Sequence, residues 1–454
     1  MSLNLNASSL QLTCHKALYV GVFSLFSLML ASSGQTLAQT LQSETPISKT
    51  DLTGFEMAAP VSDNPLAAGK DDLNLEVISS HDLLTTGMQD VEDNRLDLAV
   101  RKFQEILRRE PGNVSAHNNL AVCLKRQGNK EAAIEEFRKA LANNPSRPEL
   151  YNNLASSLIA VGRYDEALTA LYQALRLQPD FAEAHRNLGH VLASKGDNDG
   201  AVTAYQQAIQ ESLTSGASGA QNDTRLSDLH FDLGDCLRSI HRYEQALLEY
   251  RAADKLGAAA GEAYRQSVAL RTAKCYEALG RYEESRKLLN QLLEKDPDDT
   301  DSLNCLGVVL WKMKQLPEAV FVLERALKLD PSYPQARNNL GIVLYELKRY
   351  EEAVGVWKQA LSLKRDYPEA HYNMGVALYQ TGLFDQSIDA YKECLKYAPQ
   401  DPFAHNNLGL AYLRKGERAD AIAQWRRAIE CDQNCAEAYT NLGKLLKESA
   451  VKPE

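Results

Sequence analysis

The chain has 454 residues, of which 44% are hydrophobic and 24% charged, so it holds enough apolar material for a core. With 25 glycines and 15 prolines it is neither collagen-like nor wholly disordered. The net charge of −10 disfavours nucleic acid as a partner, because phosphate contacts need a concentrated basic face, and eight cysteines are too few for a disulfide scaffold.

The N-terminus has the pattern of a secretory signal peptide over residues 1–38. A single strong base, Lys16, precedes an apolar run from Ala17 to Ala31, and small residues end the segment at Ala38. This run is shorter than the roughly 20 residues that span a bilayer. We therefore predict cleavage and an exported protein, whether periplasmic, lumenal or extracellular. The alternative is an uncleaved membrane anchor at residues 17–31, and only in that case do we expect a membrane partner.

Residues 39–79 mix serine, threonine, proline and charged residues without a sustained apolar period, which predicts a flexible linker. From residue 80 onward the sequence repeats every 34 residues. Prolines mark the period at Pro111, Pro145, Pro179, Pro297 and Pro331. We number each unit so that these prolines stand at position 32. Full units then begin at residues 80, 114, 148, 182, 227, 266, 300, 334, 368 and 402, and a half unit begins at residue 436.

Each unit has the spacing of two amphipathic helices. Positions 4, 7, 8 and 11 share one face of a first helix, and positions 20, 24, 27 and 28 share one face of a second. Position 8 is always glycine or alanine, position 20 is always alanine or serine, and position 24 is always large and apolar. Glycine at position 15 in most units separates the two helices. We expect the small residues to let the two helices approach closely.

This pattern resembles the tetratricopeptide repeat family over residues 80–449. One unit reads RPELYNNLASSLIAVGRYDEALTALYQALRLQPDF. The resemblance implies an all-α fold, a right-handed superhelical α-solenoid of helix-turn-helix repeats. We expect a capping helix at 436–449, a short tail at 450–454, and loop insertions at 216–226 and 261–265 that divide two arms, 80–215 and 266–449.

A solenoid presents one concave surface, built from the first helix of each unit. Position 6 on this surface is asparagine in most units, and such a row resembles the asparagine ladder with which the repeat superhelix of O-GlcNAc transferases holds peptides. The resemblance implies a peptide-binding role for Asn119, Asn153, Asn187, Asn339, Asn373, Asn407 and Asn441. The alternative is that these asparagines are consensus residues that satisfy neighbouring backbone. Asp232, Arg271 and Cys305 interrupt the row.

The C-terminal arm adds an apolar row beside the asparagines. We expect these side chains to be exposed in a binding groove, at position 9 as Val308, Ile342, Val376 and Leu410, and at position 12 as Trp311, Tyr345 and Tyr379. The same positions are more polar in the N-terminal arm. Extended segments of other proteins are the partners that this surface predicts.

Other residues carry weaker signals. His190 beside Glu183 and Asp235 is a candidate cation site, although one histidine per unit is not a metal-ligand spacing. Cys431 and Cys435 are close enough in sequence for a local disulfide, or they are two free thiols. We expect no cofactor and no catalytic residues. The first reading is an exported, non-enzymatic scaffold or assembly factor. The alternatives are a substrate-presenting subunit of a separate glycosyl- or other transferase, and a metal-carrying assembly factor.

Overall fold

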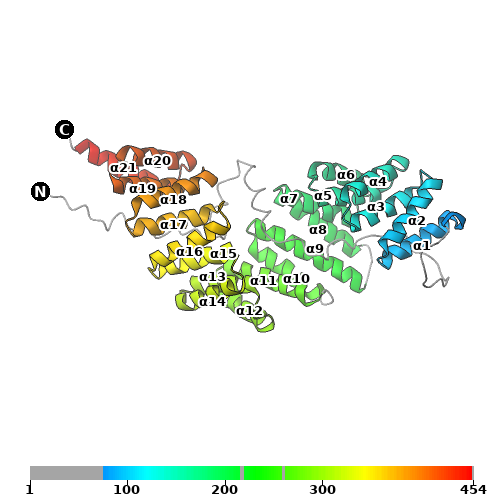
Figure 1. The fold of residues 1–454 in the computed structure, drawn as a ribbon, viewed down its shortest axis with the longest axis horizontal. Helices are drawn as coiled ribbons and strands as arrows, with labels where there is room; N and C mark the ends of the chain where they lie inside the picture. Colours follow the sequence, from blue (N-terminus) through cyan, green and yellow to red (C-terminus); the bar gives the residue numbers. More distant parts are fainter. Residues whose placement is uncertain (1–74, 215–218, 258–260, 452–454) are drawn as a thin grey trace. The chain divides into compact units, whose positions relative to one another are not determined.

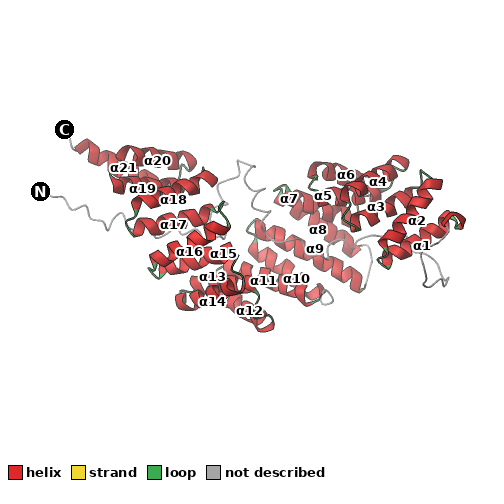
Figure 2. Cartoon of the chain, in the orientation of Figure 1, coloured by secondary structure: helices red, strands yellow, loops and turns green. Residues whose placement is uncertain are grey.

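The computed structural model describes residues 75–214, 219–257 and 261–451, and the regular elements in these ranges are all helices (Figure 2). The predicted signal peptide and residues 39–74 of the predicted linker lie outside the described residues. The end of that linker is a short 3-10 helix, Leu75–Val77, and Arg109 donates to the carbonyl oxygens of Leu75 and Ile78, each at 2.6 Å. These last linker residues therefore pack on the first repeat. None of the described helices is long and apolar enough to cross a membrane.

The helices alternate along the chain between the first and the second helix of each unit (Figure 1). The first helices are α1 (Ser80–Glu92), α3 (Val114–Arg126), α5 (Pro148–Ala160), α7 (Ala182–Ser194), α9 (Ala220–Ser239), α11 (Glu262–Ala278), α13 (Thr300–Lys312), α15 (Pro334–Glu346), α17 (Pro368–Gln380), α19 (Pro402–Lys415) and α21 (Ala436–Val451). The second helices are α2 (Leu96–Arg109), α4 (Lys130–Asn143), α6 (Tyr164–Leu177), α8 (Asn198–Thr214), α10 (Tyr243–Leu256), α12 (Tyr282–Lys295), α14 (Leu316–Leu329), α16 (Tyr350–Leu363), α18 (Phe384–Tyr397) and α20 (Arg418–Cys431). The all-α solenoid prediction is confirmed.

One left-handed residue at position 15 turns the chain between the two helices of every full unit. Six units place a glycine there, such as Gly128 at φ 87°. The other four place Asn94, His241, Lys314 and Lys348 there, at φ 59° to 63°. The turn geometry is therefore kept even where the sequence departs from glycine, and a non-glycine residue in this conformation costs about 1–2 kcal/mol.

Small residues at position 8 make room for the large residue at position 24. A Cβ atom on Gly341 would lie 2.5 Å from the Trp357 ring, which is closer than real contacts allow. A serine at position 20 adds a hydrogen bond at the same crossing, because Ser387 Oγ donates to the carbonyl oxygen of Gly375 at 2.8 Å. Helix pairs in one unit are thus held by close packing and by polar contacts together.

The described parts of the two predicted insertions are not simple loops, and residues 216–218 of the first insertion lie outside the described residues. Residues 220–226 form the first turns of α9, and residues 262–265 form the first turn of α11. The added turns are bound to their neighbours: Tyr264 Oη lies 2.8 Å from Ser227 Oγ, which donates to the carbonyl oxygen of Ala253 at 2.7 Å. The extra residues therefore lengthen two first helices instead of adding only loop.

The described chain divides into two compact bodies, an N-terminal body of residues 75–268 and a C-terminal body of residues 269–451. In each, consecutive helices pack in chain order, and some first helices also contact the next first helix, as α5 contacts α7 and α13 contacts α15. The division falls within α11, so the repeat that begins at residue 227 belongs with the N-terminal body. This body is therefore longer than the N-terminal arm that the insertions predict.

Candidate interaction surface

The position-6 asparagines form hydrogen bonds from one repeat to the next. In each of these amide rungs, as we name them, Nδ2 of the position-6 asparagine donates to the position-5 side chain of the preceding unit, 35 residues earlier. The rungs are Asn153 to Asn118 (3.0 Å), Asn187 to Asn152 (2.7 Å), Asn339 to Asn304 (2.8 Å), Asn373 to Asn338 (3.1 Å), Asn407 to Tyr372 Oη (2.9 Å) and Asn441 to Asn406 (3.0 Å). The asparagine row therefore joins neighbouring first helices.

This finding corrects part of the ladder hypothesis. Asn373, Asn407 and Asn441 are buried, so their amides serve the packing of repeats and are not presented to a peptide. The remaining four, Asn119, Asn153, Asn187 and Asn339, are half-buried. For those four a peptide-binding role stays a prediction. The observed bonds join side chains of neighbouring repeats, whereas the consensus alternative expected bonds to neighbouring backbone.

The rung nearest the insertions is an ion pair instead of an amide pair. Arg186, at position 5 on α7, donates to the Asp232 carboxylate on α9 at 3.1 Å, and His190 lies 3.7 Å from the same carboxylate. Burial alone would raise the pKa of Asp232, but Arg186 and His190 outweigh it and hold that pKa below its usual range. A charged pair thus keeps the connection where asparagine is missing.

The apolar row is not exposed, which corrects that expectation. Val308, Ile342, Val376, Leu410, Trp311 and Tyr345 are buried, and Tyr379 is half-buried. The tyrosine rings at position 12 reach the first residue of the second helix in their own unit. The ring centres of Tyr345 and Tyr350 lie 5.1 Å apart, and those of Tyr379 and Phe384 lie 5.5 Å apart. Most of the row therefore packs into one apolar cluster of the C-terminal core, while Leu410 packs in a separate cluster with residues of α20 and α21.

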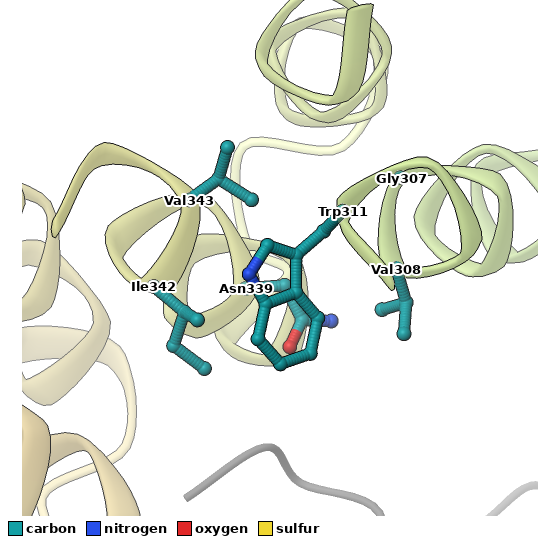
Figure 3. Close-up of a pocket in the computed structure, with 6 residues that line it drawn as sticks. All are labelled: Gly307, Val308, Trp311, Asn339, Ile342 and Val343. Atoms are coloured by element: carbon teal, nitrogen blue, oxygen red, sulfur yellow. The ribbon is translucent and has the colours of Figure 1, made fainter. Parts of the chain in front are cut away.

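A small hollow lies within this row, between α13 and α15 (Figure 3). It is lined by Gly307, Val308, Trp311, Asn339, Ile342 and Val343. The Trp311 ring extends from α13 into the space between the two helices (Figure 3). Its Nε1–H is buried and has no hydrogen-bond acceptor in the described structure. Trp357 and Trp425 differ, because their Nε1–H groups donate to Asn338 Oδ1 at 3.0 Å and to the Asn406 carbonyl oxygen at 3.1 Å.

Cationic side chains lie near the Trp311 ring. Lys312 Nζ lies 4.3 Å from the centre of the Trp311 ring, and Lys314 Nζ lies 2.8 Å from the Glu346 carboxylate. Burial lowers the pKa of Lys312. Sequence reasoning named Trp311 for its apolar surface and missed its unsatisfied donor, because a pattern of residue types does not show which polar atoms find partners. It also missed Lys312, which stands next to Trp311 in the chain.

The corresponding face of the N-terminal body is more polar, as its sequence predicts. Lys125 on α3 donates to Ser156 Oγ on α5 at 2.7 Å, again linking two first helices. Burial, with the nearby charge of Lys130, lowers the pKa of Lys125 to about 8. Val122, at position 9 of the same helix, is buried. This face carries a titratable amine where the C-terminal body carries Trp311.

The histidines at position 4 have structural partners. In four units Nε2 lies 2.9–3.2 Å from the carbonyl oxygen six residues earlier, as for His117 and Pro111. The candidate cation site does not assemble: Glu183 pairs with Arg225, and Asp235 accepts a hydrogen bond from Tyr250 Oη at 2.5 Å. Over the described ranges, no three histidine, cysteine, aspartate or glutamate side chains converge as metal ligands would.

Cys431 and Cys435 are both free thiols in the structure, so the local disulfide is not formed. Cys431 Sγ lies 3.2 Å from Gln400 Oε1, and Cys435 is buried. Burial raises the pKa of both thiols, which lowers the share of reactive thiolate.

The family follows from the sequence patterns that match the chain. A pattern described as TPR repeat matches residues 312–348, 343–382 and 378–416. Patterns described as tetratricopeptide repeat match residues 84–148, 152–217, 242–304 and 402–435. Together with the helix pairs and their turns, these matches show that the chain belongs to the tetratricopeptide repeat family. Among curated proteins, none matches this sequence.

Several solved structures resemble part of the chain. A crystal structure of MamA protein is 23% identical, covers 38% of this chain and 94% of its own, and has a TM-score of 0.34. MamA from Desulfovibrio magneticus RS-1 is 22% identical over 37% of this chain and 96% of its own, with a TM-score of 0.35. YrrB, described as a TPR protein with an unusual peptide-binding site, is 21% identical over 38% of this chain and 89% of its own, with a TM-score of 0.34.

Proposed function

We propose that the protein is a non-catalytic scaffold that binds extended segments of other proteins on the first helices of its C-terminal body. The observation that carries this proposal is the hollow between α13 and α15, together with the buried Nε1–H of Trp311, which has no acceptor in the described structure. A buried donor without an acceptor costs about 1–3 kcal/mol. A ligand that widens the hollow and brings a carbonyl oxygen to this donor recovers that cost.

The chemistry of the hollow defines the segment that fits it. Val308, Ile342, Val343 and the Trp311 ring supply apolar walls, and that ring carries one buried donor. An extended peptide offers both matching parts, a backbone carbonyl oxygen and an aliphatic side chain a few ångströms away. The half-buried Asn339 amide lies beside them and is already oriented by its rung to Asn304. A site of this kind recognises backbone shape more than a particular side-chain sequence.

The test uses peptides selected by phage display on the full chain. Trp311→Phe keeps an aromatic ring but removes the donor, and it should weaken binding of a selected peptide about 5- to 150-fold, because binding no longer recovers the cost of about 1–3 kcal/mol. Phe321→Ala is the control, because Phe321 is 70% exposed on α14. Tryptophan emission gives a second readout, since Trp357 and Trp425 are fully buried and already hydrogen-bonded. Equal affinity for wild type and Trp311→Phe would remove the basis of the proposal.

We also propose that the scaffold acts after export. The support is the order of Lys16, the apolar run and the small residues before Ala38, and the mature chain should begin near Gln39. N-terminal sequencing of the native protein tests this directly. Intact Met1 in a cytosolic fraction would contradict it, and intact Met1 in a membrane fraction would favour the anchor at residues 17–31.

A further inference from the structure

Two lysines stand on first helices at the start of the C-terminal body. Lys274, on α11, occupies position 9, where the next two first helices carry Val308 and Ile342. Lys312 follows Trp311 on α13, and its Nζ lies 4.3 Å from the centre of the Trp311 ring. Both lysines are half-buried. The row that is apolar from α13 onward therefore becomes cationic toward α11.

These two lysines outnumber the carboxylate beside them. Burial raises the pKa of Glu277 on α11, and the charges of both lysines oppose this rise, so the three groups lie close together. Within the described residues, neither ammonium group forms an ion pair or a hydrogen bond. The neighbouring carboxylate of Glu346 is already paired with Lys314 at 2.8 Å. Two ammonium groups and one carboxylate thus leave an excess of positive charge at this place.

We propose that the peptide segment bound beside Trp311 carries an aspartate or a glutamate, and that its carboxylate pairs with Lys274 and Lys312. This inference rests on the function proposed above and specifies the charge of the partner. A lysine ammonium has three N–H donors and no acceptor, so two of them match an anion with two oxygens. Charge-assisted hydrogen bonds are stronger than neutral ones, and partial exclusion of water strengthens them further. A basic residue at the same place in the segment would be repelled.

The spacing of the helices determines where this acidic residue stands in the segment. The hollow lies between α13 and α15, and the two lysines lie on α11 and α13, so the two subsites are separated by one helix spacing. Packed helices are about 8–10 Å apart, and an extended chain advances about 3.3 Å per residue. We therefore expect the acidic residue about two to four positions from the aliphatic residue that enters the hollow.

The experiment extends the peptide selection on the full chain. Selected peptides should be enriched in aspartate or glutamate at this distance from an aliphatic residue. In the tightest peptide, replacing the acid by its amide should weaken binding to the wild-type chain about 3- to 10-fold. Higher ionic strength should reduce this difference, because salt screens the pair. In the double variant Lys274→Gln, Lys312→Gln, the acid and amide peptides should bind equally, and circular dichroism checks its fold.

The double variant Lys287→Gln, Lys358→Gln is the matched control, because it removes the same charge from two exposed lysines on the second helices α12 and α16. It should keep the preference for the acid peptide. The inference would be overturned by equal binding of both peptides to the wild-type chain, by a preference that survives in Lys274→Gln, Lys312→Gln, or by selected peptides without the acid. Those results leave the proposed function standing if Trp311→Phe still weakens the peptides, whereas no effect of Trp311→Phe would overturn both.

Discussion

At the residue scale, the non-glycine residues in left-handed turns lower the free energy of unfolding, and a substitution by glycine should remove this cost. Lys348 adopts φ 62° at position 15, where most units use glycine, and its side chain is exposed. Lys348→Gly should raise the free energy of unfolding by about 1 kcal/mol, because glycine adopts this conformation without a Cβ clash. Urea unfolding measures the change. Lys358→Gly, inside α16, should have the opposite sign and lower stability by about 1 kcal/mol, so equal effects at both positions would contradict the argument.

Glu211 provides a pH-dependent prediction at the same scale. Burial, together with the carboxylates of Asp180 and Glu183, raises the pKa of Glu211 to about 7, and His185 Nε2 lies 3.2 Å from its carboxylate. The folded chain therefore binds more protons at Glu211 than the unfolded chain between the two pKa values. The free energy of unfolding should fall as pH rises from the ordinary glutamate range through about 7.

Glu211→Gln removes this term. The variant should be more stable than wild type at pH 8 by on the order of 1–3 kcal/mol, and about equal to it at pH 4, where Glu211 is neutral in the folded state. Urea midpoints at the two pH values provide the measurement. Exposed Glu244→Gln serves as the control and should shift neither midpoint. A Glu211→Gln variant whose advantage is the same at both pH values would show that ionisation is not the cause.

At the element scale, we expect the amide rungs to stabilise the fold. Asn373 is fully buried, and its Nδ2 donates to Asn338 Oδ1 at 3.1 Å. Asn373→Ala should lower the free energy of unfolding of the C-terminal body by about 1–3 kcal/mol. Exposed Asn290→Ala should stay within about 0.5 kcal/mol of wild type. If Asn373→Ala is as stable as wild type, the rung contributes nothing measurable.

The helices themselves were predictable from sequence because small, large and proline residues recur at fixed positions, and such periodicity is a property of one chain segment. The partners of surface residues were not predictable in the same way. Whether Asn373 faces a ligand or Asn338 depends on how two helices 35 residues apart are placed. The burial of Ile342 likewise depends on packing between units. The prediction of a loop at the first insertion was wrong for a further reason. Residues 220–226 are polar, as in a loop, but they form the start of α9, for which Gly219 is the N-cap.

At the scale of the whole molecule, damage should stay near its source, because each repeat contacts only its neighbours. Leu340 is buried in the C-terminal core, and Leu340→Ala should cost about 2–5 kcal/mol. Hydrogen exchange should rise in the units that begin at residues 334 and 368, while residues 114–181 keep their protection. A uniform rise along the described chain would contradict a quasi-one-dimensional architecture.

The 35-residue spacing of the amide rungs makes the repeats interchangeable parts. Deleting residues 334–367, one whole unit, brings Asn373 to the same sequence distance from Asn304 that Asn339 now has. In the shortened array, Asn373 can form with Asn304 the amide hydrogen bond that Asn339 forms now. A duplicated unit can form the same kind of bond with the unit before it. A deletion that is not a multiple of 34 residues needs a new connection, as Arg186 and Asp232 supply beside the insertion at 216–226. Gene duplication and recombination can therefore change the length of this protein in whole repeats without requiring a new contact between neighbouring first helices.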